Sequence, residues 1–394
     1  MTTATTATTA TGAPRIDSLT GLRFLAAGAV LMHHTLAPTI IGGGVVQIPG
    51  TRRLAIVGYV GVTTFFMLSG FVLAWSWDDR RTKAGFYGRR FARVWPLHAL
   101  TWAVAVLLVL PFTSVGVGHQ PATLAQNVAG LALVHGWVPS PRWYFAGNGP
   151  SWSLACEAFF YALLPFLVPV LRRSGRRAAV STVVVCTVLL ALVPLVVREV
   201  TQGTYTLLSL AVFPGYRVGE FLIGVVLGWA IRSGWRPSWQ LSHAVVATAV
   251  AYVAAALLVG GLFFSTTRRD RALGNMYADV IILIPVAALI AALATRDLAG
   301  RPTWLAKPLP VLLGGASFAF YLVHTSVITW AGQLPLQVLR TAHGLPVLVG
   351  VVVIALALAL ALHRFVERPV EKALRRWIES REAARSEALA RGLT

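Results

Sequence analysis

The sequence contains few charged residues and almost no cysteine, and each shortage excludes a class of protein. Only 12% of the 394 residues are charged, whereas 56% are hydrophobic and the mean hydropathy is +0.70. A soluble core cannot bury so much apolar surface, so lipid must solvate most of the chain. Cys156 and Cys186 lie in apolar segments without metal-ligand or redox spacing, and we expect them to be packing residues.

Acidic residues are scarce as well, with 14 against 34 lysines and arginines and a formal net charge of +20. This excess could suggest a nucleic-acid partner, but the arginines form short clusters between apolar runs instead of one basic face. Membrane topology explains such clusters better, because cytoplasmic loops are enriched in Arg and Lys. We therefore expect membrane lipid around the chain, no nucleic-acid partner and no bound metal.

The two ends of the chain differ from its apolar middle. Residues 1–15 begin with a Thr/Ala repeat that lacks the basic and apolar regions of a signal peptide, and we expect a disordered tail. Residues 377–394 mix Glu and Arg at helical spacing, which predicts a polar cytoplasmic helix or tail. Residues 16–376 then form one membrane domain.

The apolar runs predict an all-α, polytopic membrane helix bundle with about ten transmembrane helices of ~20 residues each. The expected spans are residues 19–40, 55–76, 95–115, 151–171, 179–197, 213–231, 243–264, 277–295, 309–331 and 344–366. Loop charge places the basic clusters at 80–93, 172–177, 232–236, 296–307 and 364–375, and both termini, on the cytoplasmic side. The cluster at Arg268, Arg269 and Arg271 is an exception that faces outward.

One apolar stretch, residues 124–137, is too short for an ordinary span. The spans at 95–115 and 151–171 already return the chain to the same side. An additional crossing would move one of the flanking arginine clusters outside. We therefore predict an interfacial or re-entrant segment that is buried against protein.

Titratable side chains inside the hydrocarbon cost several kcal/mol unless they are paired, so those present are candidates for function. The alternative is that each one only links helices through hydrogen bonds. In this sequence the intramembrane candidates are Arg23, His33, His34, Glu157, Arg217, Glu220, Asp279 and His324.

Three of these residues fall at similar depth in the outer half of the predicted bundle, namely His34, Glu157 and His324. Arg23 and His34 are separated by about three helical turns and about 16 Å, which places them on one helix face. His33 points elsewhere. A buried neutral histidine can act as a general base toward a hydroxyl, and a neighbouring carboxylate can orient it.

Several motifs carry a resemblance to a known family along almost the whole chain, from Ile16 to Pro369. IDSLTGLRFLAAGAVLMHH resembles the start of the membrane acyltransferase-3 family, with the family's Arg and His at Arg23 and His34. GYVGVTTFFMLSGFVLAWSW resembles its second span, and FYGRRFARVWPLHAL resembles its basic entry into the third. PSWSLACEAFFYALLP is similar to its Trp-Ser-Leu motif with a following Glu. That motif corresponds here to Trp152, Ser153, Leu154 and Glu157.

Weaker similarities occur in RVGEFLIGVVLGW, FAFYLVH and VERPVE. They supply Arg217, Glu220, Tyr321, His324, Glu367 and Pro369. The chain departs from the family where many members carry Asp or Ser before the FF of the second span, because Thr63 and Thr64 stand there. The extracytoplasmic hydrolase-like domain of some glycan-modifying members is also not expected, so the reaction would be completed inside the bundle.

The resemblance implies an enzyme of the bacterial plasma membrane that transfers an acetyl or other short acyl group from acyl-CoA to a hydroxyl. The acceptor would be a sugar, a surface glycan or a macrolide-type natural product, and no permanently bound cofactor is implied. Arg89, Arg90 and Arg93 are candidates for the coenzyme A phosphates because Arg binds phosphate bidentately. They could equally serve only to set topology.

The predicted mechanism is direct transfer, in which Arg23 helps to hold the donor and His34, oriented by Glu157, deprotonates the acceptor. Supporting roles are expected for Ser69, Trp152, Ser153, Arg217, Glu220, Tyr321 and His324. An acyl-enzyme at Ser69, Ser153 or Cys156 is the alternative route. A polytopic transporter and a purely structural membrane protein are the alternative classes, although no inverted repeat of the Arg-His pair supports a transporter.

Overall fold

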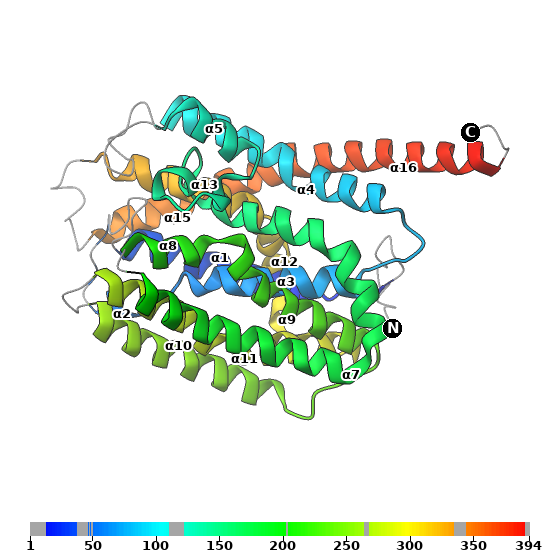
Figure 1. The fold of residues 1–394 in the computed structure, drawn as a ribbon. Helices are drawn as coiled ribbons and strands as arrows, with labels where there is room; N and C mark the ends of the chain where they lie inside the picture. Colours follow the sequence, from blue (N-terminus) through cyan, green and yellow to red (C-terminus); the bar gives the residue numbers. More distant parts are fainter. Residues whose placement is uncertain are drawn as a thin grey trace.

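The computed structural model describes residues 13–37, 46, 48, 50–109, 122–201, 204–263, 268–334 and 344–390, and the elements formed there are helices (Figure 1). They are α1 (Asp17–Leu36), α2 (Arg52–Ala55), α3 (Val60–Trp75), α4 (Lys83–Val104), α5 (Leu124–Leu131), α6 (Pro141–Tyr144), α7 (Trp152–Val200), α8 (Thr204–Val212), α9 (Pro214–Arg232), α10 (Leu241–Phe263), α11 (Arg268–Leu298), α12 (Pro308–Gly315), α13 (Ser317–Ala331), α15 (Leu345–Leu362) and α16 (Arg368–Ala390). Short turns of other helix types lie between them. They include the π-helical turns η1 (Ala105–Val109) and η8 (His363–Glu367) and the 3-10 turn η4 (His135–Trp137).

Eight of the described helices are long and apolar enough to cross a membrane, or nine if the bent pair α12 and α13 counts as one span. The predicted all-α polytopic bundle is therefore confirmed. The predicted span at residues 19–40 corresponds to α1, a helix of 20 residues that carries Arg23, His33 and His34. Because these polar side chains lower its hydropathy, α1 is not among the eight, and its crossing stays a prediction.

Contacts between the ends of helices bring the basic clusters to one end of the bundle, which we call the basic end. Arg232 donates to the backbone oxygens of Trp75 (2.7 Å) and Trp77 (2.5 Å), which joins the end of α9 to the end of α3. Arg172 pairs with Asp79. The end of the first half of α7 therefore lies against the loop between α3 and α4. These contacts agree with the prediction that the arginine clusters lie on one side of the membrane.

The first turn of α1 lies at the same end. Ser18 donates through its backbone N–H (2.7 Å) and its hydroxyl (2.6 Å) to Asp297 at the end of α11. Trp75 donates its indole N–H to the carbonyl of Pro14 (3.0 Å). Which side of the membrane the basic end faces stays a prediction, and so does the disordered tail, of which residues 1–12 lie outside the described part of the chain.

Two local features agree with the predicted path of the chain. Residues 124–137 form only α5, of 8 residues, and the short turn η4, so they do not cross. The expected burial against protein is only partial, because Leu124, Val128 and Trp137 are exposed. Within α7 the helix is broken at Gly175, whose φ of 72° and ψ of −171° are readily adopted only by glycine. The break separates two candidate spans, residues 149–173 and 175–200, at the cluster of arginines between them.

The centre of the bundle is formed by α3 and α9, which approach each other through glycines. A Cβ atom on Gly70 would lie 2.1 Å from the carbonyl oxygen of Phe221, and one on Gly224 would lie 2.1 Å from that of Met67. Such small residues permit helices to pack closely where lipid gives no hydrophobic driving force. The tight contact fixes α3 against α9 and α7, beside the cavity described next.

Candidate active site

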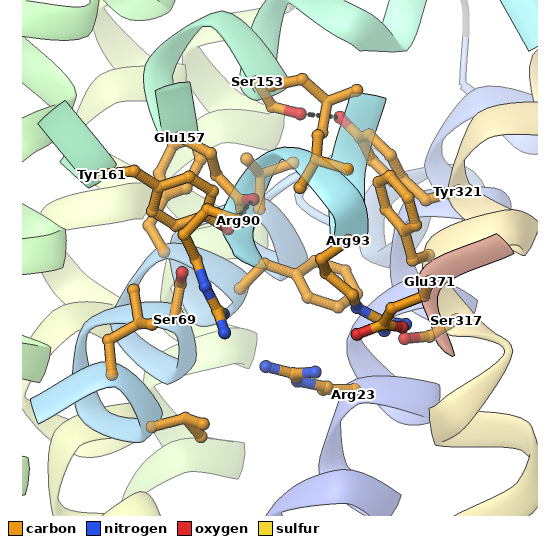
Figure 2. A pocket seen from close by; sticks show the side chains of 18 of the residues that line it. Arg23, Ser69, Arg90, Arg93, Ser153, Glu157, Tyr161, Ser317, Tyr321 and Glu371 are labelled. Atoms are coloured by element: carbon orange, nitrogen blue, oxygen red, sulfur yellow. Dashed lines mark hydrogen bonds and ion pairs between the residues drawn. The ribbon is translucent and has the colours of Figure 1, made fainter. Parts of the chain in front are cut away.

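A cavity of about 330 Å³ extends from the basic end into the bundle between α1, α3, α4, α7, α13 and α16. Figure 2 shows the guanidinium groups of Arg23 on α1 and of Arg90 and Arg93 on α4 pointing into the same space, with Ser153, Glu157 and Tyr321 above them. The polar side chains that line it are Arg23, Ser69, Ser76, Arg90, Arg93, Ser153, Glu157, Tyr161, Ser317, Tyr321, Glu371 and Arg375.

The arginines of the cavity differ in their pairing. Arg93 is held by Glu367 and by Glu371, the latter at 3.0 Å. Arg23 and Arg90, in contrast, make no hydrogen bond or ion pair with any residue of the described ranges, and the Nε atom of Arg90 is buried without a partner. Unpaired guanidinium groups in a partly buried cavity favour an anionic ligand.

Arg89, the third predicted phosphate ligand, lies outside this cavity. Its side chain is buried and forms an ion pair with Glu382 of α16 at 3.1 Å. The spacing along α4 explains the difference, because neighbouring residues on a helix point about 100° apart. Arg89 therefore faces α16 and Arg90 faces the cavity, whereas Arg93, one turn beyond Arg89, reaches both the cavity and Glu371 of α16.

The inner part of the cavity is lined by hydroxyl groups and one carboxylate. The Ser153 hydroxyl donates to that of Tyr321 (2.9 Å), and both hydroxyls lie within hydrogen-bonding distance of the carbonyl of Pro150. Tyr161 donates to Glu157 at 2.6 Å. These groups come from α7 and α13, in agreement with the sequence motifs that named Ser153, Glu157 and Tyr321.

The two predicted histidines meet one helical turn beyond Tyr321. His34 Nδ1 lies 3.1 Å from His324 Nε2 and 3.0 Å from the carbonyl oxygen of Val30. His324 Nδ1 lies 2.6 Å from the carbonyl oxygen of Tyr321, and the rings of Tyr321 and His324 are 5.6 Å apart. Neither histidine is among the described residues that line the cavity, so Tyr321 separates its inner end from the pair.

The predicted hydrogen bond between His34 and Glu157 is not formed. Among the described residues, the hydrogen-bond partner of the Glu157 side chain is Tyr161, and the side-chain partner of His34 is His324. The position of Glu157 along α7 accounts for this, because Glu157 lines the cavity one turn closer to the basic end than Ser153. His33 contacts the carbonyl of Ala55 (3.3 Å), in agreement with its expected different direction.

A second polar cluster is buried between α3, α9 and α11. Arg217 contacts Asp279 (2.6 Å) and Glu220 (3.1 Å), and the Thr63 hydroxyl donates to Asp279 (2.6 Å). The guanidinium also lies 5.4 Å from the ring centre of Phe66 and 5.9 Å from that of Trp152. Arg217, Glu220 and Trp152 therefore connect helices beside the cavity without lining it.

The candidates for an acyl-enzyme are not equivalent in the structure. Cys156 is fully buried and its thiol points to the carbonyl of Val212 (3.4 Å), away from the cavity. Ser69 and Ser153 line the cavity, but no basic side chain within the described chain hydrogen-bonds to Ser153. A serine nucleophile needs such a base, so the geometry gives no support to an acyl-enzyme at Ser153.

Sequence reasoning missed part of the cavity wall. Tyr161, Ser317, Glu371 and Arg375 line it without having been named as candidates. Tyr161 follows Glu157 by one helical turn, and this spacing could have identified it. Arg375 could not have been identified, because only the path of α16 shows that it returns to α4. Among the described residues, no group of three His, Cys, Asp or Glu side chains could hold a metal ion.

Most of the chain matches a known protein family. The family described as Acyltransferase domain, the acyltransferase-3 family, matches residues 16–364. The chain belongs to this family. It is a membrane-embedded acyltransferase of the family, as the opening motif and the Trp-Ser-Leu motif predicted, and this membership favours an enzyme over a transporter.

Three bacterial proteins are similar in sequence over most of the chain. Acyltransferase MdmB of Streptomyces mycarofaciens is 33% identical, over 92% of this chain and 93% of its own length. Exopolysaccharide production protein ExoZ of Rhizobium meliloti is 28% identical over 70% of this chain and 79% of its own. O-acetyltransferase OatA of Staphylococcus aureus is 24% identical over 91% of this chain but only 58% of its own. No solved structure matches the chain.

Proposed function

We propose that this protein transfers an acetyl or other short acyl group from acyl-CoA to a hydroxyl of a sugar, a surface glycan or a natural product. The observation that carries the proposal is the cavity itself, which has unpaired arginines at the basic end and ends one helical turn from the pair of His34 and the buried His324. A donor with phosphates at one end and a thioester at the other matches this distribution of charge.

The hydrogen bonds around the two histidines support His34 as the general base. His324 donates from Nδ1 to the carbonyl of Tyr321, so its Nε2 carries a lone pair and accepts from His34 Nδ1. The carbonyl of Val30 favours the same tautomer of His34. His34 Nε2 then holds a lone pair, and no described residue is hydrogen-bonded to that atom.

In the proposed step, His34 Nε2 takes the proton of the acceptor hydroxyl while the hydroxyl oxygen attacks the carbonyl carbon of the thioester. The new C–O bond forms the ester, the C–S bond breaks, and the coenzyme A thiolate leaves and takes up the proton that the His34 imidazolium gives back. His324 accepts the Nδ1–H of His34 and so stabilises the imidazolium in the role first expected for Glu157. Tyr321 and Ser153, at the inner end of the cavity, position the acyl group.

Arg23, Arg90 and Arg93 are proposed to bind the donor, and Glu157 to balance the charge of Arg23. The cavity opens at the basic end, which corresponds to the cytoplasmic side predicted from the arginine clusters. This orientation suits acyl-CoA, and the bacterial relatives suit a location in the bacterial plasma membrane. Arg217, Glu220 and Trp152 are proposed to support the site by fixing α3 and α9.

The acceptor is proposed from the names of the relatives. O-acetyltransferase OatA and exopolysaccharide production protein ExoZ suggest acetyl transfer and a glycan acceptor. The more similar MdmB is named only as an acyltransferase, so the acceptor classes to test are glycans, simple sugars and macrolide-type natural products.

The test is to incubate membranes containing the protein with labelled acetyl-CoA and each acceptor class, and then to identify the product that gains an ester. We expect His34→Ala to lose transfer while the protein stays folded. His243→Ala, which changes an exposed histidine on α10, is the matched control and should keep full activity. Transfer by the His34→Ala variant would reject the base assignment, and no ester from any acceptor would reject the proposed activity.

A further inference from the structure

The C-terminal helix continues the last span beyond the hydrocarbon. Residues 345–384 form one helical stretch of 40 residues. At ~1.5 Å per residue it is about 60 Å long, twice the ~30 Å thickness of the hydrocarbon. Figure 1 shows α16 beside α4 and projecting past its first turns. Residues 368–390 also follow the part of the chain that matches the family, which ends at residue 364.

Specific contacts hold α16 against α4. Glu382 accepts from Thr82 (2.5 Å), the N-cap residue of α4, and from Arg89 (3.1 Å) on the second turn of α4. The helices approach closely at Gly85, where a Cβ atom would lie 1.9 Å from Glu382 Oε1. The position of α16 is therefore fixed by the fold, and its residues near α4 have a defined place at the mouth of the cavity.

Two residues of α16 line the cavity. Glu371 bridges two guanidinium groups, at 3.0 Å from Arg93 and 2.5 Å from Arg375. The Nε atoms of Arg375 and Arg90 are both buried without a hydrogen-bond partner. Four arginines line the cavity against two glutamates, so the mouth retains an excess of positive charge and unused donors after its own ion pairs are made.

We infer that Arg375 of α16 binds a phosphate group at the nucleotide end of the donor, together with Arg90 of α4, and that Glu371 positions Arg93 and Arg375 for this contact. The inference rests on the proposed acyl-CoA donor and extends it, because it assigns one wall of the donor site to a helix that follows the matched domain. A planar guanidinium suits a phosphate, which accepts two parallel hydrogen bonds.

A phosphate at this position could also belong to an anionic lipid headgroup, since the mouth lies at the end of the bundle. The experiment separates the two sources. Binding of coenzyme A, dephospho-coenzyme A and pantetheine is measured with the purified full-length protein in nanodiscs of phosphatidylcholine alone, and again in nanodiscs with added phosphatidylglycerol. Variants are Arg375→Ala, Arg375→Lys and the matched control Arg376→Ala, which changes an exposed neighbour on another side of α16.

We expect Arg375→Ala to weaken coenzyme A binding by about tenfold, since a charge-assisted hydrogen bond contributes that much. Pantetheine binding should change by less than about twofold, because pantetheine carries no phosphate. Arg375→Lys keeps the charge without the planar pair of donors, and should lie between Ala and wild type. It serves as the test if the Ala variant does not fold. Arg376→Ala should bind like wild type in both kinds of nanodisc.

Four results would overturn the inference. Equal losses for coenzyme A and pantetheine would show that Arg375 acts only on the fold. Unchanged coenzyme A binding, with a loss of the response to phosphatidylglycerol, would assign the site to lipid. If the wild-type protein transfers from acyl-CoA and Arg375→Ala binds coenzyme A normally, only this inference is wrong. If the wild-type protein does not bind coenzyme A, the proposed donor is wrong as well.

Discussion

His324 Nε2 lies 3.1 Å from His34 Nδ1, so a histidine of α13 occupies the place beside α1 where an acidic partner was expected. Both nitrogens of His324 are used, one toward a carbonyl of its own helix and one toward His34. A neutral histidine that accepts a hydrogen bond can fix a tautomer as a carboxylate does. It avoids placing an additional negative charge in the membrane.

Replacement of His324 should therefore impair chemistry more than donor binding. For His324→Ala we expect kcat to fall by about 10²-fold or more, as is typical when a catalytic base loses its orientation. The KM for acyl-CoA should stay close to the wild-type value. His324→Gln can still accept a hydrogen bond from His34 and should restore part of the rate. Steady-state kinetics of all three proteins check this, and an unchanged kcat in His324→Ala would contradict the proposed pair.

Replacement of Glu157 tests whether Glu157 or His324 orients the base His34. Because Glu157 is hydrogen-bonded to Tyr161 and not to His34, Glu157→Gln should lower kcat by less than about tenfold, well short of the loss for His324→Ala. The remaining effect would come from the altered charge beside Arg23. Glu157→Gln and His324→Ala are compared at saturating acceptor. A larger loss of kcat for Glu157→Gln than for His324→Ala would support the prediction from the sequence, in which Glu157 orients His34.

Arg90 and Arg93 should behave differently although both line the cavity. Arg93 is paired with the buried Glu367, so Arg93→Ala should cost about 3 kcal/mol of stability by leaving that carboxylate with His363 as its remaining partner. Arg90 has no such partner, and Arg90→Ala should weaken coenzyme A binding about tenfold with little change in stability. Thermal unfolding in detergent and coenzyme A titration measure the two effects. Equal melting temperatures for both variants would contradict the difference in pairing.

The buried Arg217 cluster should be structural. Asp279→Asn removes the closer of the two carboxylates that contact Arg217 in the bundle interior, and we expect a loss of about 3 kcal/mol. The matched control is Asp79→Asn, which changes an exposed pair with Arg172 and should cost less than ~1 kcal/mol. Unfolding in denaturing detergent compares the variants, and similar stabilities would show that the cluster contributes little.

The close approach of α3 and α9 can be tested by adding a single methyl group at Gly70. Gly70→Ala would bring a Cβ to 2.1 Å from a backbone oxygen, so the helices would have to separate. We expect a loss of about 2 kcal/mol or more from this overpacking. Gly28→Ala in α1 is the control, because no heavy atom lies within 4 Å of the added Cβ. If both variants melt at the same temperature, the contact between the helices is more tolerant than proposed.

Sequence reasoning predicted the fold well because lipid imposes strong rules. Apolar runs identified the helices, and arginine clusters correctly required residues 124–137 not to cross. The motifs also identified side chains that meet, since Arg23, Ser153, Glu157 and Tyr321 line one cavity. Each of these follows from local pattern or from resemblance.

Pairing between distant helices could not be predicted in the same way. Depth along a span placed His34, Glu157 and His324 at one level, but depth does not give rotation or the neighbour of each helix. Arg89 and Arg90 differ by one residue and face different partners for that reason. The return of α16 to α4 depends on tertiary contacts such as that of Glu382 with Arg89, which have no sequence pattern.

The ion cluster also has a consequence for the order in which the protein is made. Arg217 and Glu220 lie one turn apart on the same helix, so α9 can enter the bilayer with its own counter-charge. Asp279 is synthesised 62 residues after Arg217. During biogenesis the pair on α9 is therefore already balanced before α11 is made, and docking of α11 then adds Asp279 as a second carboxyl partner of Arg217.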